Sequence, residues 1–118
     1  MIISSTLIFN TGQDNTAVGN GVLSALTSGS LNTVVGSLAA NNLGTGSQHV
    51  AIGYNALNNN CHGSENTAVG TYALQCNVGG YNNTAIGYNA MNEGTDGNDN
   101  VAIGRCSNDS ITKINCTT

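Results

Sequence analysis

The pentad Asn66-Thr67-Ala68-Val69-Gly70 returns 17 positions later as Asn83-Thr84-Ala85-Ile86-Gly87, and this spacing decides the fold. Outward from these two copies, the same pattern occurs at four further places, always with the same 17-residue period and without an insertion. The four further copies begin at Asn15, Asn32, His49 and Asn100. A fixed period is typical of stacked structural units, whereas low-complexity sequence drifts in its spacing. The sequence therefore predicts an ordered repeat protein.

Composition narrows the classes of protein to which this chain can belong. Asn, Gly, Thr and Ser together make up half of the 118 residues, and these residue types favour turns, caps and strands over helices. Charged residues account for 7%, with Arg105 and Lys113 the two cations and a net charge of −4. Nucleic-acid binding depends on many basic contacts to phosphates, so we do not expect a nucleic-acid partner. The apolar runs are only a few residues long, so we expect no membrane insertion.

Each repeat reads as one coil of an all-β, parallel β-solenoid of six 17-residue coils. The pentads are short, β-branched and bounded by glycine, which predicts a strand, and the remaining residues form a return path of about twelve residues. Two glycine columns are expected at corners or at close backbone approaches. The first pentad position, Asn in five copies and His49 in the sixth, predicts a ladder of side chains hydrogen-bonded along the axis. His49 is then a ladder member and not a ligand for a metal or substrate.

The two faces of the strand lead to a prediction about assembly. Alternate residues of a strand face opposite sides. The second and fourth pentad positions, Thr or Val and Val or Ile, are assigned to the inside of the coil. The third position is then on the other face, and it is never polar. Small apolar residues there predict an interface with other copies of the chain. The alternative is that Ala is simply tolerated in contact with water. The predicted interface residues are Ala17, Val34, Ala51, Ala68, Ala85 and Ala102.

The chain divides into residues 1–14, which lack the pentad, and residues 15–116, which form the six repeats. Apolar residues in 1–14 predict a cap or a docking strand that covers the first coil. The last coil departs from the pattern at Ile111 and Ile114 and is predicted to be the C-terminal cap. The alternative is that one apolar end stacks on another fibre or capsid subunit.

Cysteines and aromatic residues give the remaining candidate sites. Cys106 and Cys116 share the last coil and form a candidate disulfide, with free thiols as the alternative. The absence of a Cys-x-x-Cys pair argues against structural zinc, and the acidic stretch 93–99 is read as a solvated turn, so no metal site is expected. No catalytic constellation is recognisable, and no enzyme activity or cofactor is expected. The candidate ligand-binding residues are Tyr54, Tyr72 and Tyr88, which otherwise cover a corner.

The stretch Asp99-Asn100-Val101-Ala102-Ile103-Gly104-Arg105-Cys106-Ser107 resembles the repeats of the head domains of trimeric autotransporter adhesins. The copies at 66–74 and 83–91 are similar to repeats of phage and viral fibre proteins. The resemblance covers residues 15 to about 110 and implies a left-handed β-roll and a side-by-side homotrimer. The longer, 17-residue coil departs from the adhesin pattern, and so does the near absence of the adhesin serine, which occurs only as Ser107. Since no convincing signal peptide, stalk or membrane anchor is recognisable, a virion or phage component fits better than a bacterial adhesin.

These observations predict a structural or attachment protein of a surface or virion fibre, located on a virion or phage particle or at a cell surface, that could bind a glycan or receptor on its polar outer face. A purely architectural or cementing virion protein, without a host ligand, is the first alternative. Ice binding is a less favoured alternative, because the Thr column is interrupted by Val50 and Val101 and is assigned to the inside of the coil.

Overall fold

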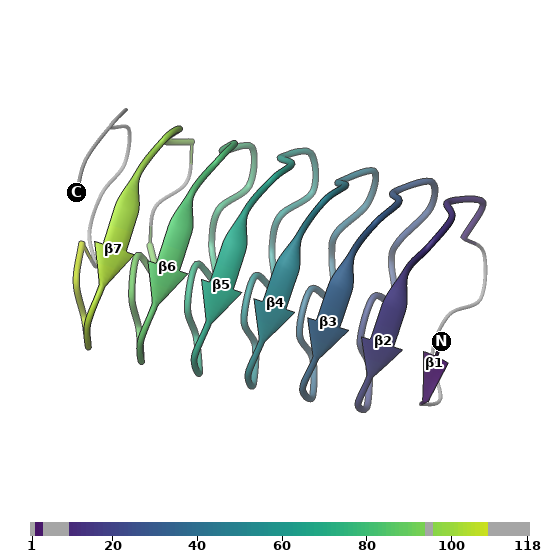
Figure 1. The fold of residues 1–118 in the computed structure, drawn as a ribbon, viewed down its shortest axis with the longest axis horizontal. Coiled ribbons are helices and arrows are strands. Elements are labelled where there is room, and N and C mark those ends of the chain that lie inside the picture. Colours follow the sequence, from purple (N-terminus) through teal and green to yellow (C-terminus); the bar gives the residue numbers. More distant parts are fainter. Residues whose placement is uncertain (1, 4–9, 94–95, 109–118) are drawn as a thin grey trace.

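The computed structural model describes residues 2–3, 10–93 and 96–108, and in these residues the protein is a parallel β-solenoid without a helix (Figure 1). Seven short strands pair in chain order to form one sheet along the side of the solenoid. The strands are β1 (Ile2–Ile3), β2 (Thr16–Val18), β3 (Thr33–Val35), β4 (Val50–Ile52), β5 (Thr67–Val69), β6 (Thr84–Ile86) and β7 (Val101–Ile103). The prediction of an all-β, parallel β-solenoid is confirmed.

The register of the sheet follows the repeat without a slip. From β2 to β7 each residue pairs with the residue 17 positions further on, so that Ala51 lies beside Ala68 and Ala68 beside Ala85. The return paths are also joined from coil to coil by backbone hydrogen bonds, as in Leu57 N–H to Ala73 O at 2.9 Å. Equivalent side chains therefore stack in straight ranks along the long axis of the molecule.

At the N-terminal edge, β1 pairs in parallel with β2, and Ile2 and Ile3 lie beside Ala17 and Val18. This strand belongs to the segment predicted as a cap or docking strand, and it covers the backbone edge that β2 would otherwise leave unpaired. Ile111 and Ile114 of the predicted C-terminal cap lie outside the described residues.

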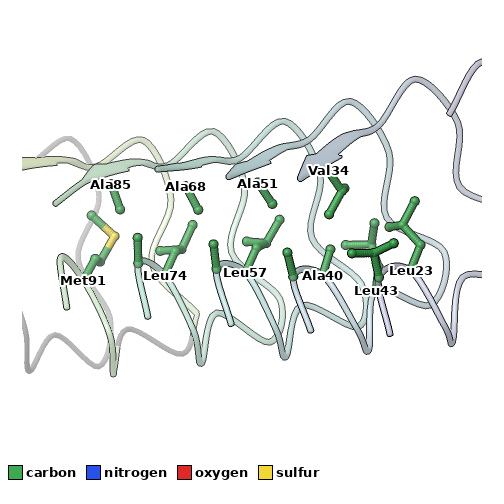
Figure 2. Packing of buried hydrophobic residues seen from close by; sticks show 14 of the residues in the cluster. Leu23, Val34, Ala40, Leu43, Ala51, Leu57, Ala68, Leu74, Ala85 and Met91 are labelled. Carbon is green, nitrogen blue, oxygen red and sulfur yellow. The ribbon is translucent and has the colours of Figure 1, made fainter. Parts of the chain in front are cut away.

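The core is a thin apolar layer enclosed between the sheet and the return path. One rank comes from the middle of each strand, and the facing ranks come from the first turn of the return path (Figure 2). Figure 2 shows Ala51, Ala68 and Ala85 pointing from the sheet towards Leu57, Leu74 and Met91. All six of these side chains are buried. Because leucine fills the space from one side, only a small residue fits on the other.

In the coil that begins at Asn32, the large and the small residue exchange places across the core. Here the strand carries the larger Val34, and the return path carries Ala40 where the neighbouring coils have Leu23 and Leu57. Val34 and Ala40 are both completely buried. The exchange of a large and a small residue across the core keeps the enclosed volume nearly constant, which well-packed interiors require.

The two glycine columns fulfil the two roles predicted for them. Glycines directly after the strands have a positive φ, as at Gly53 with φ 132°, where side chains are rarely tolerated. In the second column the constraint is a close approach: a Cβ on Gly63 would collide with the carbonyl oxygen of Gly80 in the next coil. Neighbouring coils can therefore stack only if both columns stay free of side chains.

Each coil also contains left-handed backbone positions that are not glycine. The residue before each pentad is one of them, as at Gln48 with φ 61° and Asn82 with φ 56°. The leucine rank of the return path is another, with φ 54° at Leu57 and 51° at Leu74. A bulky side chain in this conformation costs about 1 kcal/mol or more, so burial and coil-to-coil hydrogen bonding must hold these residues in place.

Candidate functional site

The rank Ala17, Val34, Ala51, Ala68, Ala85 and Ala102 does not form an interface between chains. These side chains are at most 2% exposed in a single chain, since they face the leucines of the return path. The prediction that this rank faces other copies was therefore wrong, and the two strand faces are exchanged relative to the prediction. The reason is the narrowness of the coil, whose interior is already occupied by the leucine rank and leaves room only for small side chains.

The β-branched residues at the second and fourth pentad positions face outward instead. We call these two rows the outer ranks; they comprise Thr16, Thr33, Val50, Thr67, Thr84 and Val101, and Val18, Val35, Ile52, Val69, Ile86 and Ile103. Every one of them is partly or fully exposed, while the residue between them is buried. Ile52 is 40% exposed and Ile103 is 66% exposed. The outer ranks contain no charged residue, so the exposed face of the sheet is uncharged and largely apolar.

A row of aromatic residues borders the outer ranks just beyond the ends of the strands. Tyr54 and Tyr72 make an edge-to-face contact with ring centroids 5.5 Å apart, and Tyr72 and Tyr88 make a second one at 6.1 Å. The guanidinium of Arg105 lies 5.6 Å from the ring centre of Tyr88. We call Tyr54, Tyr72 and Tyr88 the tyrosine ridge. The structure thus brings together the three tyrosines that the sequence singled out.

The contact of Arg105 with the tyrosine ridge was not predicted from the sequence, although its position in the repeat indicates it. Arg105 holds the same repeat position as Tyr54 and Tyr88, two residues after the end of the strand. Alignment on the 17-residue period therefore places it at the end of the tyrosine ridge, where a cation can interact with an aromatic face.

The predicted side-chain ladder is present inside the solenoid. Asn32 donates through Nδ2 to Gly46 O at 3.1 Å and accepts the backbone N–H of His49 on Oδ1 at 3.0 Å. Asn66 repeats this arrangement with Gly80 O at 2.8 Å and with the N–H of Asn83 at 2.9 Å. Asn32 and Asn66 thus each join their own coil to the next one and satisfy two buried backbone groups.

His49 imitates the asparagine amide in this ladder. Its Nε2 lies 3.0 Å from Gly63 O, and its Nδ1 accepts the N–H of Asn66 at 3.2 Å. Because Nδ1 is an acceptor, the ring is neutral and carries its hydrogen on Nε2. The imidazole is 1% exposed, and its burial lowers the pKa from 6.5 to about 4, against an opposing effect of the Gly63 carbonyl. The prediction that His49 is a ladder residue is confirmed.

A second internal position changes from leucine to asparagine along the chain. Leu26 and Leu43 fill it in two coils, and Asn60 and Asn77 fill it in the next two, all of them buried. Asn60 Oδ1 accepts the N–H of Gly63 at 2.7 Å, but its buried Nδ2 has no hydrogen-bond partner in the described part of the protein. Such a buried donor is destabilising.

The described cysteines and acidic residues form neither a disulfide nor a cluster of metal ligands. Cys61, Cys76 and Cys106 form no disulfide with one another or with any other described residue. Cys116 lies outside the described residues, so the candidate disulfide between Cys106 and Cys116 stays a prediction. Between residues 10 and 108, apart from 94 and 95, no three His, Cys, Asp or Glu side chains are grouped so that they could hold a metal ion. None of the described residues belongs to a helix able to cross a membrane.

No protein-family model, curated protein or solved structure matches this chain. Two surfaces of the solenoid are the candidates for a functional site: the uncharged outer ranks and the adjoining tyrosine ridge.

Proposed function

We propose that this protein is a non-enzymatic structural and attachment element of a surface or virion fibre, in which the outer ranks of three chains pack side by side in a homotrimer. The observation that supports this proposal is the exposed, uncharged sheet face. A strand that is apolar on both sides is typical of a sheet covered on both sides, and here only one side is covered by the chain itself. The face that a partner covers is thus the opposite of the face predicted from the sequence.

The regularity of the outer ranks supports a second copy of the chain as the partner. Side chains of similar shape, Thr or Val in one rank and Val or Ile in the other, recur at every coil, so two solenoids placed side by side can match over their whole length. β-Branched side chains have few rotamers and lose little entropy when they are buried between two sheets. The uncharged face also lets like chains approach without repulsion.

Native mass measurement of the full chain tests this proposal. We expect the mass of three chains for the wild type and of one chain for Ile52→Glu, because association would bury an unpaired charge. Val78→Glu is the matched control, since Val78 is also 40% exposed but lies on the return path, outside the outer ranks. A wild-type protein that stays monomeric at high concentration would contradict the trimer, and equal dissociation of both variants would contradict the location of the interface.

Attachment and cementing differ in where the protein lies on a particle. Labelling of intact virions or cells with antibodies against the chain distinguishes them. An accessible chain on the surface is expected for an attachment fibre. A chain reached by antibody only after disruption of the particle favours the cementing role and contradicts attachment.

Ice binding is a second candidate, favoured by the outward position of the Thr-containing rank. The sequence pattern assigns Thr16, Thr33, Thr67 and Thr84 to the inside of the coil, but they lie on the exposed face of the sheet. One argument against ice binding therefore no longer holds. The interruptions at Val50 and Val101 remain. A thermal-hysteresis assay decides the point: ice binding predicts a gap between freezing and melting that Thr67→Lys removes, and no gap in the wild type excludes this function.

A further inference from the structure

The tyrosine ridge is exposed although its rings contact one another. Tyr54 and Tyr88 are 43% and 44% exposed, and Tyr72 between them is partly buried. The interplanar angles of 79° and 76° mean that each contact places an edge against a face, which is a favourable aromatic geometry. The rings are thereby held in fixed orientations while part of each remains accessible from the solvent.

The backbone beneath the tyrosine ridge is held from coil to coil. Tyr72 N–H donates to Tyr54 O at 2.9 Å, and Cys106 N–H donates to Tyr88 O at 2.8 Å. Asn92 Nδ2 adds a bond to Tyr72 O at 3.1 Å. A ligand that contacts the three rings would therefore meet a preformed surface and would not have to order a loop, which lowers the entropic cost of binding.

The surroundings of the tyrosine ridge are polar but nearly uncharged. Asn55 and Asn89 are partly exposed next to the rings, and Thr71 lies between Tyr54 and Tyr88 in the repeat. The hydroxyl groups of the three ridge tyrosines have no protein acceptor in the part of the chain that the structure describes, whereas Tyr81, elsewhere on the surface, donates to His62 O. Arg105 places a cation over the ring of Tyr88 at one end of the ridge.

We propose that the tyrosine ridge binds a neutral glycan chain that lies along the axis of the solenoid. A sugar ring offers an apolar C–H face to an aromatic ring and hydroxyl groups to amides and phenols, and the ridge presents both kinds of partner. Tyr54 and Tyr88 belong to coils two strand spacings apart, roughly 10 Å, which is close to the length of a disaccharide unit in an extended chain. The scarcity of charge favours a neutral ligand over an acidic one.

This inference rests on the attachment role proposed above, but it uses different residues from self-association. The outer ranks form the proposed contact between chains, whereas the ridge lies beyond the ends of the strands. Loss of sugar binding and loss of the trimer can therefore be measured separately.

Titration of the full chain with cellohexaose, maltohexaose and N-acetylchitohexaose tests the proposal by calorimetry and tyrosine fluorescence. The chain has no tryptophan, and three of its four tyrosines form the ridge, so the emission reports mainly on this surface. We expect at least one hexasaccharide to bind and to change the emission. Tyr54→Ala and Tyr88→Ala should each weaken binding by about three- to tenfold, as expected for the loss of one aromatic contact.

Tyr81→Ala is the matched control, because Tyr81 is 45% exposed and lies outside the ridge. Thermal unfolding of every variant tests whether the fold is kept, and native mass measurement gives its oligomeric state. Failure of the wild type to bind any of the three sugars at millimolar concentration would overturn the proposal. An equal loss in Tyr81→Ala and Tyr88→Ala would overturn it as well. Ridge variants that change the oligomeric mass in a protein that binds no sugar would assign the ridge to a second copy of the chain.

Discussion

Replacement of His49 by Asn is expected to remove a specific part of the pH dependence of stability. In the folded protein the buried imidazole has a pKa of about 4, whereas its ordinary value is 6.5. Well above pH 6.5 the ring is neutral in both the folded and the unfolded chain, so it adds no pH dependence. As the pH falls from 6.5 towards 4, the unfolded chain binds a proton that the folded chain does not, and the folded state loses stability.

The size of this effect follows from the two pKa values. The difference of about 2.5 pH units corresponds to about 3 kcal/mol, reached near pH 4 and constant below it. Protonation at Nδ1 would also turn the acceptor for the Asn66 N–H into a second donor, so the charged ring has no place in the ladder. In His49→Asn, Nδ2 and Oδ1 take over both bonds, as they do at Asn32 and Asn66.

Urea unfolding followed by circular dichroism, at several pH values between about 7 and 4, measures the expected difference. We expect the free energy of unfolding of the wild type to fall more steeply than that of His49→Asn, with the two curves separating by about 2 kcal/mol near pH 5. The two proteins share every other ionisable group, so the contributions of those groups cancel in the comparison. Any cost of the smaller side chain is independent of pH and shifts one curve as a whole. Two parallel curves would refute the reasoning, because a ring that charges freely in the folded state cannot be a buried, neutral ladder residue.

Three further predictions concern the interior and the corners, and thermal or urea unfolding tests each of them. Asn60→Leu is expected to stabilise the fold by about 1 kcal/mol, because it removes a buried donor without a partner and restores the leucine that the first two coils have at this position. Destabilisation would mean that the hydrogen bond accepted by Asn60 Oδ1 contributes more than the unpaired Nδ2 costs. Gln48→Asn is expected to add about 0.5 to 1 kcal/mol, because asparagine tolerates the left-handed conformation that Gln48 adopts with φ 61°; an unchanged midpoint would show that this position is not strained. Ala68→Leu is expected to lower the free energy of unfolding by about 3 kcal/mol, because it overpacks a completely buried site. Val69→Leu, on the exposed face, should lower it by less than about 0.5 kcal/mol. Similar losses in both variants would contradict the assignment of the two strand faces.

The period of the sequence is sufficient to predict the solenoid, its register, the glycine columns and the ladder. These features depend on what recurs with the 17-residue period, and stacking makes each recurrence a contact between neighbouring coils. The same information could not tell which strand face points inward. Both faces are apolar, and the rule that large apolar residues are buried favours Val69 over Ala68, although Ala68 is the buried one.

A departure from the repeat, unlike its regularity, does indicate which strand face is inside. Val34 and Ala40 exchange a large and a small residue within one coil, which indicates that these two columns share the interior. The positive φ values of Leu57, Leu74 and Gln48 have no such signal, because these residue types do not favour that conformation. The tyrosine ridge is partly visible from repeat positions, but the contact of Arg105 with Tyr88 depends on how the corner is built.

The coil-to-coil hydrogen bonds also determine how the protein would respond to force. They run along the axis of the solenoid, so tension applied to the two ends loads the bonds of one terminal coil at a time. Each coil that detaches releases one 17-residue repeat, or roughly 50 to 55 Å of extended chain beyond the height it occupied in the stack. An element of this kind lengthens in equal steps under axial tension, whereas shear across the sheet loads all strands together. In a fibre, the solenoid would therefore resist bending as a rigid body and absorb an axial pull one coil at a time.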